Sequence, residues 1–194
     1  MARPALTRPG AAAPAPSKAP RVTTLHLVCG AAGAGKTTHA LRLCEELGAL
    51  HLSIDDWMVT LFGPDAPQPP QWPWIAERVA RCEAQILRTA VACARRGLPV
   101  VLDLSFLRAD QRARAAQAAR EAGLDLRLHL LDPGPEERWR RVEARNAAQG
   151  ETYRVTVTRP MFDFIESLWQ RPSPEEMAAL NGHDVRALHD SAPI

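Results

Sequence analysis

A run of glycine and alanine residues that ends in lysine and threonine carries the clearest chemistry in this sequence. It matches the pattern G-x-x-x-x-G-K-[ST] from its first glycine to its first threonine. In this pattern the amide groups of the loop surround nucleotide phosphates, the lysine reaches the β- and γ-phosphates, and the hydroxyl faces Mg²⁺. The run therefore predicts a phosphate-binding P-loop. Its expected nucleotide-binding residues are Gly30, Ala31, Ala32, Gly33, Ala34, Gly35, Lys36, Thr37 and Thr38.

Lysine is rare in this chain. Only Lys18 and Lys36 occur among 194 residues, whereas arginine occurs 22 times. One interpretation of that bias is the codon composition of the gene. Lys36 is nevertheless a compact ammonium group, which can thread along a P-loop where a planar guanidinium is too wide. We therefore expect Lys36 to be the cation that acts on the transferred phosphoryl group.

Three acidic residues are expected at one edge of a sheet. Asp55 and Asp56 follow a predicted strand over 49–54, and Asp103 lies within a continuous apolar run over 98–104. In open α/β sheets, ligands bind beyond the carboxyl ends of the strands. We expect Asp55 to be the general base of a phosphoryl transfer, and Thr37 and Asp103 to form the Mg²⁺ side of the site.

A purely structural role is an alternative for both Asp56 and Asp103. Asp56 fits the N-cap of a helix that starts at Trp57, since aspartate is among the preferred capping residues. We favour that role for Asp56 over a catalytic one. Asp103 could instead be a buried acid that bonds to backbone amides or to the P-loop.

A stripe of arginines is expected on the helix over 135–148. Arg138, Arg141 and Arg145 lie at i, i+3 and i+7, so they share one face. One interpretation is a solvated surface that pairs with Glu136, Glu137 and Glu143. The other is a lid whose arginines close on the transferred phosphoryl group, where bidentate contacts count most. Because the helix follows the fourth predicted strand, we favour the lid, with Arg141 and Arg145 as its catalytic residues.

The pattern along the chain predicts alternating strands and helices. Strands are expected over 22–29, 49–54, 98–104 and 124–131, and helices over 37–48, 75–96, 108–122, 135–148, 158–169 and 173–180. A proline-crowded loop is expected over 62–74. This alternation indicates a parallel sheet with right-handed crossovers. The predicted fold class is α/β, a P-loop NTPase three-layer α/β/α sandwich with a parallel sheet and a helical lid.

Other reactive side chains give weaker signals. Trp72 and Trp74 could stack on a substrate ring, but more often such residues anchor a loop. His26, His39 and His51 are spread over separate elements and show no metal-ligand spacing. The cysteines have no C-x-x-C spacing and are expected to be buried free thiols in a reducing cytoplasm; they are Cys29, Cys44, Cys82 and Cys93.

Charge and composition limit the classes of partner. Four of the 24 basic residues and none of the 22 acidic ones lie in 1–21, which leaves a net charge of −2 on the remainder. A broad basic surface for nucleic acid is therefore not expected. We predict a disordered Ala/Pro-rich leader over 1–20, a kinase domain over 21–180 and a C-terminal tail over 181–194. No run of 18 apolar residues occurs, so no membrane span is expected.

Taken together, these residues resemble the small P-loop kinases related to the 5′-kinase domain of phage polynucleotide kinase, chloramphenicol phosphotransferase and zeta toxins. The resemblance covers about 22–174. It rests on the P-loop, on the acidic pair after the second strand, on Val101-Leu102-Asp103 and on 141–146. It implies that the first acid of the pair, Asp55, is the general base. Segments 158–164 and 171–176 are similar to the ending of uncharacterised bacterial predicted kinases.

The resemblance implies ATP and Mg²⁺ as cofactors, and the sequence contains no guanine-reading N-K-x-D motif. Polynucleotide kinases have an arginine where this chain has Met58, and a later lid arginine where it has Gln149. Both differences remove anion contacts. We therefore expect phosphoryl transfer to a hydroxyl of a neutral small molecule, such as a sugar, nucleoside or antibiotic. The alternatives are a nucleotide or polynucleotide kinase, and an ATP-dependent switch for a protein partner.

Overall fold

A parallel β-sheet forms the centre of the molecule. The computed structural model describes residues 23–150 and 153–185. Their five strands lie in the order β2-β3-β1-β4-β5, and every pair is parallel. The strands are β1 (Thr24–Cys29), β2 (Leu50–Ser53), β3 (Val100–Asp103), β4 (Asp125–Leu130) and β5 (His183–Asp184). The predicted leader over 1–20 lies outside the described residues.

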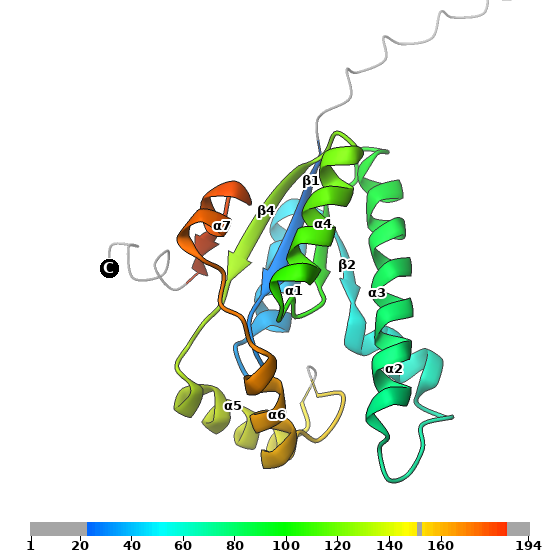
Figure 1. The fold of residues 1–194 in the computed structure, drawn as a ribbon, viewed down its shortest axis with the longest axis vertical. Helices are drawn as coiled ribbons and strands as arrows, with labels where there is room; N and C mark the ends of the chain where they lie inside the picture. Colours follow the sequence, from blue (N-terminus) through cyan, green and yellow to red (C-terminus); the bar gives the residue numbers. More distant parts are fainter. Residues whose placement is uncertain (1–22, 151–152, 186–194) are drawn as a thin grey trace, which may run out of the picture.

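Helices cover both faces of this sheet and one of its ends. They are α1 (Lys36–Leu47), α2 (Ile54–Phe62), α3 (Trp72–Ala94), α4 (Ala109–Glu121), α5 (Pro135–Ala148), α6 (Arg159–Leu168) and α7 (Pro174–Ala179). Figure 1 shows α3 and α4 in front of the sheet and α1 behind it, with α5 and α6 beyond the end toward which the strands point. The predicted three-layer α/β fold is confirmed.

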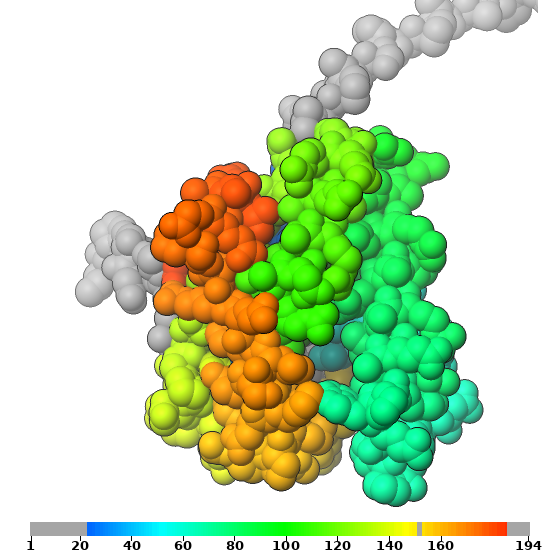
Figure 2. All heavy atoms as spheres, in the orientation of Figure 1, coloured from blue at the N-terminus to red at the C-terminus, as the bar shows by residue number. Residues whose placement is uncertain are grey.

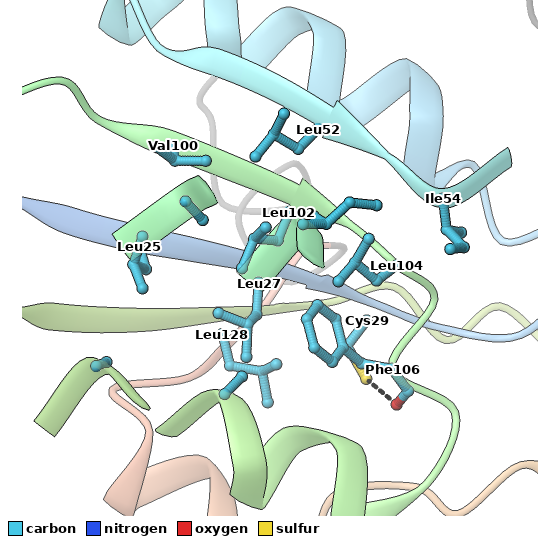
Figure 3. Packing of buried hydrophobic residues seen from close by; sticks show 14 of the residues in the cluster. Leu25, Leu27, Cys29, Leu52, Ile54, Val100, Leu102, Leu104, Phe106 and Leu128 are labelled. Atoms are coloured by element: carbon cyan, nitrogen blue, oxygen red, sulfur yellow. Dashed lines mark hydrogen bonds between the residues drawn. The ribbon is translucent and has the colours of Figure 1, made fainter. Parts of the chain in front are cut away.

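The alternation of side chains along the strands builds two cores. Leu25 and Leu27 of β1 face α3 and α4, where they join Val100, Leu102 and Leu128 in the larger apolar cluster (Figure 3). Val28 points to the opposite face, where a smaller cluster packs against α1. Successive side chains of a strand point to opposite faces. The same alternation therefore turns Asp103, two residues after Val101, toward α1.

Helix α3 begins earlier than the sequence predicted. The expected loop over 62–74 is shorter, because α3 already starts at Trp72. Proline is well tolerated in the first turn of a helix, so Pro73 does not delay that start. The Trp72 ring packs against Phe164 of α6 with a centroid distance of 4.4 Å, and Trp74 packs edge-on against Phe62. These contacts support the interpretation of both tryptophans as anchors.

Two further expectations need correction. The sheet continues into the region assigned to a C-terminal tail, because β5 pairs with β4 through His129 and Leu130. A two-residue strand is too short to give a periodic signal. The cysteines are unpaired, but Cys44 and Cys93 are only partly buried. Among the described residues, no helix combines the length and the apolar character that a membrane span needs.

A histidine cluster lies on the α1 face of the sheet. It comprises His26, His39, His129 and His183. His129 Nε2 lies 3.0 Å from His26 Nδ1, and His129 Nδ1 lies 3.0 Å from His39 Nε2. The sequence showed His26 and His39 on separate elements, and only the fold brings their rings to His129. His51 stays apart, beside Asp103.

The direction of these hydrogen bonds follows from Arg42. Its guanidinium lies 3.3 Å from His39 Nδ1 and can only donate, so this nitrogen accepts. His39 Nε2–H then donates to His129, and His129 Nε2–H donates to His26. Burial, with the nearby charge of Arg127, lowers the pKa of His26 to about 4, and burial with the neighbouring His183 and His26 lowers that of His129 to about 2. His26 and His129 are therefore neutral at pH 7.

We expect the free energy of unfolding to fall as the pH drops from about 6.5 toward 4. The unfolded chain binds protons at His26 and His129 near pH 6.5, whereas the folded chain binds them only at much lower pH. Each such proton changes the stability by about 1.4 kcal/mol per pH unit. Urea unfolding between pH 7.5 and 4.5 measures this slope. His129→Gln, which does not titrate, should reduce the slope by one proton, and an equal slope in both proteins would contradict this assignment.

Candidate functional site

A cleft of about 670 Å³ opens at the carboxyl ends of the strands. The P-loop and the start of α1 form its floor. The ends of β2 and β3 and the helices α5 and α6 form its walls. In Figure 2, α6 lies below α4 in that view, and the surface is hollowed between α6 and α3. All three predicted acids lie in this cleft, together with Lys36 and Thr37.

Glycines let the P-loop turn tightly against α5. Gly33 has φ +77°, and a Cβ on it would lie 2.3 Å from the carbonyl oxygen of Arg138. Gly35, with φ +90°, precedes the first residue of α1. Only glycine adopts such angles at little cost. Lys36 Nζ donates to the carbonyl oxygen of Ala31 at 3.0 Å, so the lysine lies along the loop as the motif predicts.

Thr37 and Asp103 lie in direct contact. Thr37 Oγ1 donates to Asp103 Oδ2 at 2.8 Å, and His51 Nε2 lies 3.6 Å from the same oxygen. Burial alone would raise the pKa of Asp103. The adjacent His51 ring, the charge of Lys36 and the hydrogen bond from Thr37 outweigh burial and lower the pKa instead. Asp103 is therefore an ionised, acceptor-only carboxylate beside the P-loop hydroxyl.

Asp55 is the second residue of α2, and the cleft leaves it open to solvent on one side. Protein atoms surround it on the others. This burial raises the pKa of Asp55, and the charge of Asp103 raises it further, while Lys36 and Arg145 oppose the shift. Burial likewise lowers the pKa of Lys36, against the effect of Asp103 and Asp55. A carboxylate with a raised pKa is a stronger base.

The predicted capping role of Asp56 is wrong. Ser53 is the N-cap of α2, and its Oγ accepts the backbone N–H of Asp56 at 3.2 Å. The helix starts earlier than expected, because Ile54 belongs to it and not to the strand. The Asp56 carboxylate is therefore free to form an ion pair with Arg154, which comes from the segment between α5 and α6. This pair bridges the cleft.

We expect Ser53→Ala to destabilise the protein more than Asp56→Asn does. Loss of an N-cap side chain costs about 0.5–2 kcal/mol. An ion pair whose partners are 36% and 42% exposed contributes at most about 1 kcal/mol. Urea unfolding of both variants at pH 7.5 compares these costs. If Asp56→Asn proved the more damaging change, the assignment of the cap to Ser53 would be wrong.

The three arginines of the predicted stripe on α5 have different surroundings. Arg138 is 2% exposed, donates to the carbonyl oxygen of Pro133, and pairs with Glu166 of α6 at 2.7 Å. It therefore joins α5 to α6 and is not available to a ligand. Arg141 contacts Glu137 and, at 3.4 Å, the carbonyl oxygen of Ala34 in the P-loop. Its contact with Glu137 is one that the solvated-surface interpretation also predicted.

Arg145 lines the cleft with an unsatisfied nitrogen. Its Nε is buried and has no hydrogen-bond partner within the described part of the chain. A buried donor without a partner is costly, so such groups commonly mark the place of a ligand. A phosphate oxygen would satisfy it. Of the predicted lid arginines, Arg145 is the one with an open requirement for an anion.

Metal binding here would depend on the nucleotide. Among the described residues, no group of three or more His, Cys, Asp or Glu side chains could hold a metal ion. Mg²⁺ bound with nucleotides usually takes one or two protein ligands and keeps waters and phosphate oxygens. The contacting oxygens of Thr37 and Asp103 fit that donor set. They would hold the ion directly or through water.

The structure adds cleft residues that the sequence analysis missed. Arg154, Met161 and Ile165 come from the lid side, and Ser105 comes from the turn after β3. Ser105 stands two residues beyond Asp103 at the end of a strand, which is a signal that sequence reasoning could have used. Arg154 gives no such signal, because it is one of 22 arginines and lies outside every predicted element.

Comparison with known proteins agrees with this geometry. A protein family described as AAA domain matches residues 25–160. The fold is similar to that of Kti12 from Chaetomium thermophilum, solved with ADP-AlF3, with a TM-score of 0.62 and 18% identity over 83% of this chain and 88% of that one. No curated protein sequence matches the chain significantly.

Two solved kinases share the fold as well. The APS kinase CysC from Mycobacterium tuberculosis, solved with AMPPNP and APS, has a TM-score of 0.55 and 24% identity over 89% of this chain and 99% of that one. A gluconokinase from Sinorhizobium meliloti 1021 has a TM-score of 0.50 and 17% identity over 89% and 86%. At these identities the likeness shows the fold alone.

Proposed function

Since the chain belongs to the AAA domain family and has the P-loop kinase fold, we propose that it transfers the γ-phosphoryl group of MgATP to a hydroxyl of a small molecule. One observation carries this proposal. Asp55, a carboxylate with a raised pKa, lies in the same cleft as Lys36 and Thr37 of the P-loop. A protein that only binds nucleotide has no need of a proton acceptor there.

The strand order divides the cleft into two halves. β2 and β3 lie on one side of β1, and β4 and β5 on the other. The side with Asp55 and Ser105 is here called the acceptor half. The other side, lined by Leu131, Pro133 and Val185, is called the nucleobase half. With its phosphates on the P-loop, ATP would place its adenine in the nucleobase half and its γ-phosphate toward Asp55.

The transfer needs one nucleophile, one leaving group and one proton acceptor. The acceptor's hydroxyl oxygen attacks the γ-phosphorus, and the bond from that phosphorus to the β–γ bridging oxygen breaks, which releases ADP. Asp55 takes the hydroxyl proton. Lys36 and Arg145 would balance the negative charge on the phosphoryl oxygens, and Mg²⁺ beside Thr37 and Asp103 supplies further positive charge when bound.

The lining of the acceptor half favours a neutral molecule. Met161 and Ile165 of α6 give it an apolar wall, and Arg154 is already paired with Asp56. An acceptor with a phosphate or carboxylate would need a cation that is not engaged in this way. APS kinase and gluconokinase, which share the fold, are named for small molecules and not for polynucleotides, which supports the size of the acceptor but not its neutrality. We therefore favour a sugar, nucleoside or antibiotic-like hydroxyl over a polynucleotide end.

ADP release from MgATP tests this function. The panel should contain matched neutral and anionic acceptors, namely glucose with gluconate and adenosine with adenosine 3′-phosphate, together with chloramphenicol and a 5′-hydroxyl oligonucleotide. We expect stimulation by a neutral member and none of comparable size by its anionic counterpart. Stimulation by the oligonucleotide would favour a polynucleotide kinase. MgATP binding without any transfer, together with indifference to substitution of Asp55, would favour the switch.

A further inference from the structure

The turn after β3 holds two consecutive residues in the left-handed backbone region. Ser105 has φ +63° and Phe106 has φ +48°. For residues with a Cβ this conformation costs roughly 1–2 kcal/mol each. Phe106 is buried beside Leu104 and Cys29 in the larger core (Figure 3). Such a turn persists only where the surrounding structure fixes it, and strained turns of this kind cluster at functional sites.

An ion pair between Arg112 and Glu176 fixes the turn at Phe106. The carbonyl oxygen of Phe106 accepts hydrogen bonds from Arg112 at 2.9 Å and from Cys29 Sγ at 3.4 Å. Arg112 is fully buried, and its guanidinium makes two bonds, of 2.6 and 2.9 Å, to the carboxylate of Glu176 in α7. Glu176 keeps 23% of its side chain exposed, but the guanidinium of Arg112 is out of contact with water. Burying such a charge for stability alone is seldom favourable, so a positioning role is a better explanation for this pair.

The segment between α6 and α7 also bonds to the residues that follow the turn. The backbone N–H of Gln170 donates to the carbonyl oxygen of Leu107 at 2.9 Å, and its side-chain oxygen accepts the N–H of Ala109 at the same distance. The turn is therefore fixed between α4 and residues 170–176. Segment 171–176, which is similar to the ending of bacterial predicted kinases, contains Glu176 and therefore has a structural role here.

The turn presents Ser105 to the acceptor half of the cleft. The carbonyl oxygen of Ser105 accepts the N–H of Gly30 at 3.1 Å, which locks the turn to the start of the P-loop. Ser53 and Asp103 are partners in the register of β2 and β3. Asp55 and Ser105 each follow one of these partners by two residues. The Ser105 side chain lines the cleft, and its hydroxyl has no hydrogen-bond partner in the described part of the chain.

We propose that Ser105 binds the acceptor, and that Arg112 and Glu176 are its positioning pair. This inference rests on the proposed function. The Ser105 hydroxyl donates to the oxygen that attacks the γ-phosphorus, while Asp55 accepts the proton of that oxygen. The strained turn and the ion pair hold the Ser105 hydroxyl at the attacking position before any acceptor arrives.

The test uses MgADP with and without aluminium fluoride, a planar mimic of the phosphoryl group in flight with a water in the attacking position. The measured quantity is the ratio of the two affinities. We expect Ser105→Ala and Ser105→Gly to lower that ratio by about 3- to 10-fold, the loss of one hydrogen bond. MgADP affinity itself should stay unchanged. Ser167→Ala, which removes an exposed hydroxyl on α6, is the matched control.

Strain provides a second readout. Glycine adopts φ +63° without penalty, so Ser105→Gly should melt at a higher temperature than Ser105→Ala while losing the same analogue affinity. A serine with a merely structural role would not separate stability from analogue binding in this way. Equal melting temperatures of the two variants would contradict the assigned strain.

The ion pair is tested through Glu176→Asp, which keeps the charge but is too short for the double contact. We expect a lower affinity ratio, unchanged MgADP affinity, and no further loss when Ser105→Ala is added, because both changes act through one hydroxyl. Glu175→Gln, on the exposed side of α7, is the control. Additive losses in the double variant would show that Glu176 does not act through Ser105.

Asp55→Ala separates failure of this inference from failure of the proposed function. If Asp55→Ala lowers the affinity ratio and neither Ser105 variant does, Ser105 is not an acceptor residue, and the proposed function stands. If neither Asp55→Ala nor the Ser105 variants change the ratio, the acceptor half does not hold an attacking oxygen, and both proposals fall.

Discussion

Asp55→Asn is expected to lower phosphoryl transfer by about 10²–10⁴-fold, the usual contribution of a positioned proton acceptor. Asparagine keeps the size and most of the hydrogen bonds of Asp55 but cannot take the acceptor's proton. Nucleotide affinity should change little, because Asp55 belongs to the acceptor half and not to the phosphate-binding loop. This variant should therefore lose turnover while its nucleotide affinity stays nearly unchanged.

ADP release with the acceptor from the panel, beside calorimetry with MgADP, measures the two quantities. Asp56→Asn is the matched control, since it makes the same substitution at the neighbouring position. If Asp56→Asn abolishes turnover and Asp55→Asn does not, the two roles are exchanged. If neither variant affects turnover, the acidic pair takes no part in catalysis, and an ATP-dependent switch becomes the better interpretation.

The pH dependence of turnover offers an independent check on Asp55. Burial raises the pKa of its carboxyl, so the protonated, inactive form persists to a higher pH than for an ordinary aspartate. The rate should rise with pH and level off above that raised pKa. This fall of the rate at low pH should be absent in Asp55→Asn. If the fall persists in this variant, it is caused by the titration of a different group.

Lys36→Ala is expected to abolish turnover and to weaken binding of a non-hydrolysable ATP analogue by about 10- to 100-fold. Hydrogen bonds to charged groups contribute about 1.5–3 kcal/mol, which corresponds to that range. Lys36→Arg should fail as well. The lysine chain lies along the loop with Nζ 3.0 Å from the carbonyl oxygen of Ala31, where a planar guanidinium does not fit.

Analogue affinity by calorimetry and ADP release test both substitutions. Arg81→Lys serves as the control, because it exchanges the same two residue types at an exposed position of α3 outside the cleft. Near-normal ADP release by Lys36→Arg would overturn the steric argument. Normal release by Lys36→Ala would remove the P-loop lysine from the mechanism altogether.

Local signals made much of the fold predictable. The strand before the P-loop, the helix after it, and the helix over 135–148 each rest on short-range patterns of apolar residues, glycine and proline, and the structure reproduces α5 at the predicted bounds. Errors occur where local signals compete. Ile54 has the apolar character of a strand residue, but Ser53 caps a helix at that point, so α2 starts before Asp55.

Lid residues were only partly predictable. The spacing of Arg138, Arg141 and Arg145 places them on one helical face, but it does not say what that face contacts. Packing against α6 buries Arg138 and pairs it with Glu166, whereas Arg145 keeps an unsatisfied nitrogen at the cleft. The helical period determines on which side of α5 each arginine side chain lies. The packing of α6 then determines which of these arginines can still bind a ligand.

By itself, the sequence determined the P-loop, the acids at the strand ends and the α/β class, because each depends on residues close together in the chain. Only the tertiary structure decided that Arg154 pairs with Asp56, and that Glu176 pairs with Arg112, which bonds the carbonyl oxygen of Phe106. It also decided that four histidines meet on the α1 face of the sheet. These contacts join residues that are distant in sequence. Which of many similar side chains come together depends on strand order and helix packing, and no local pattern encodes that choice.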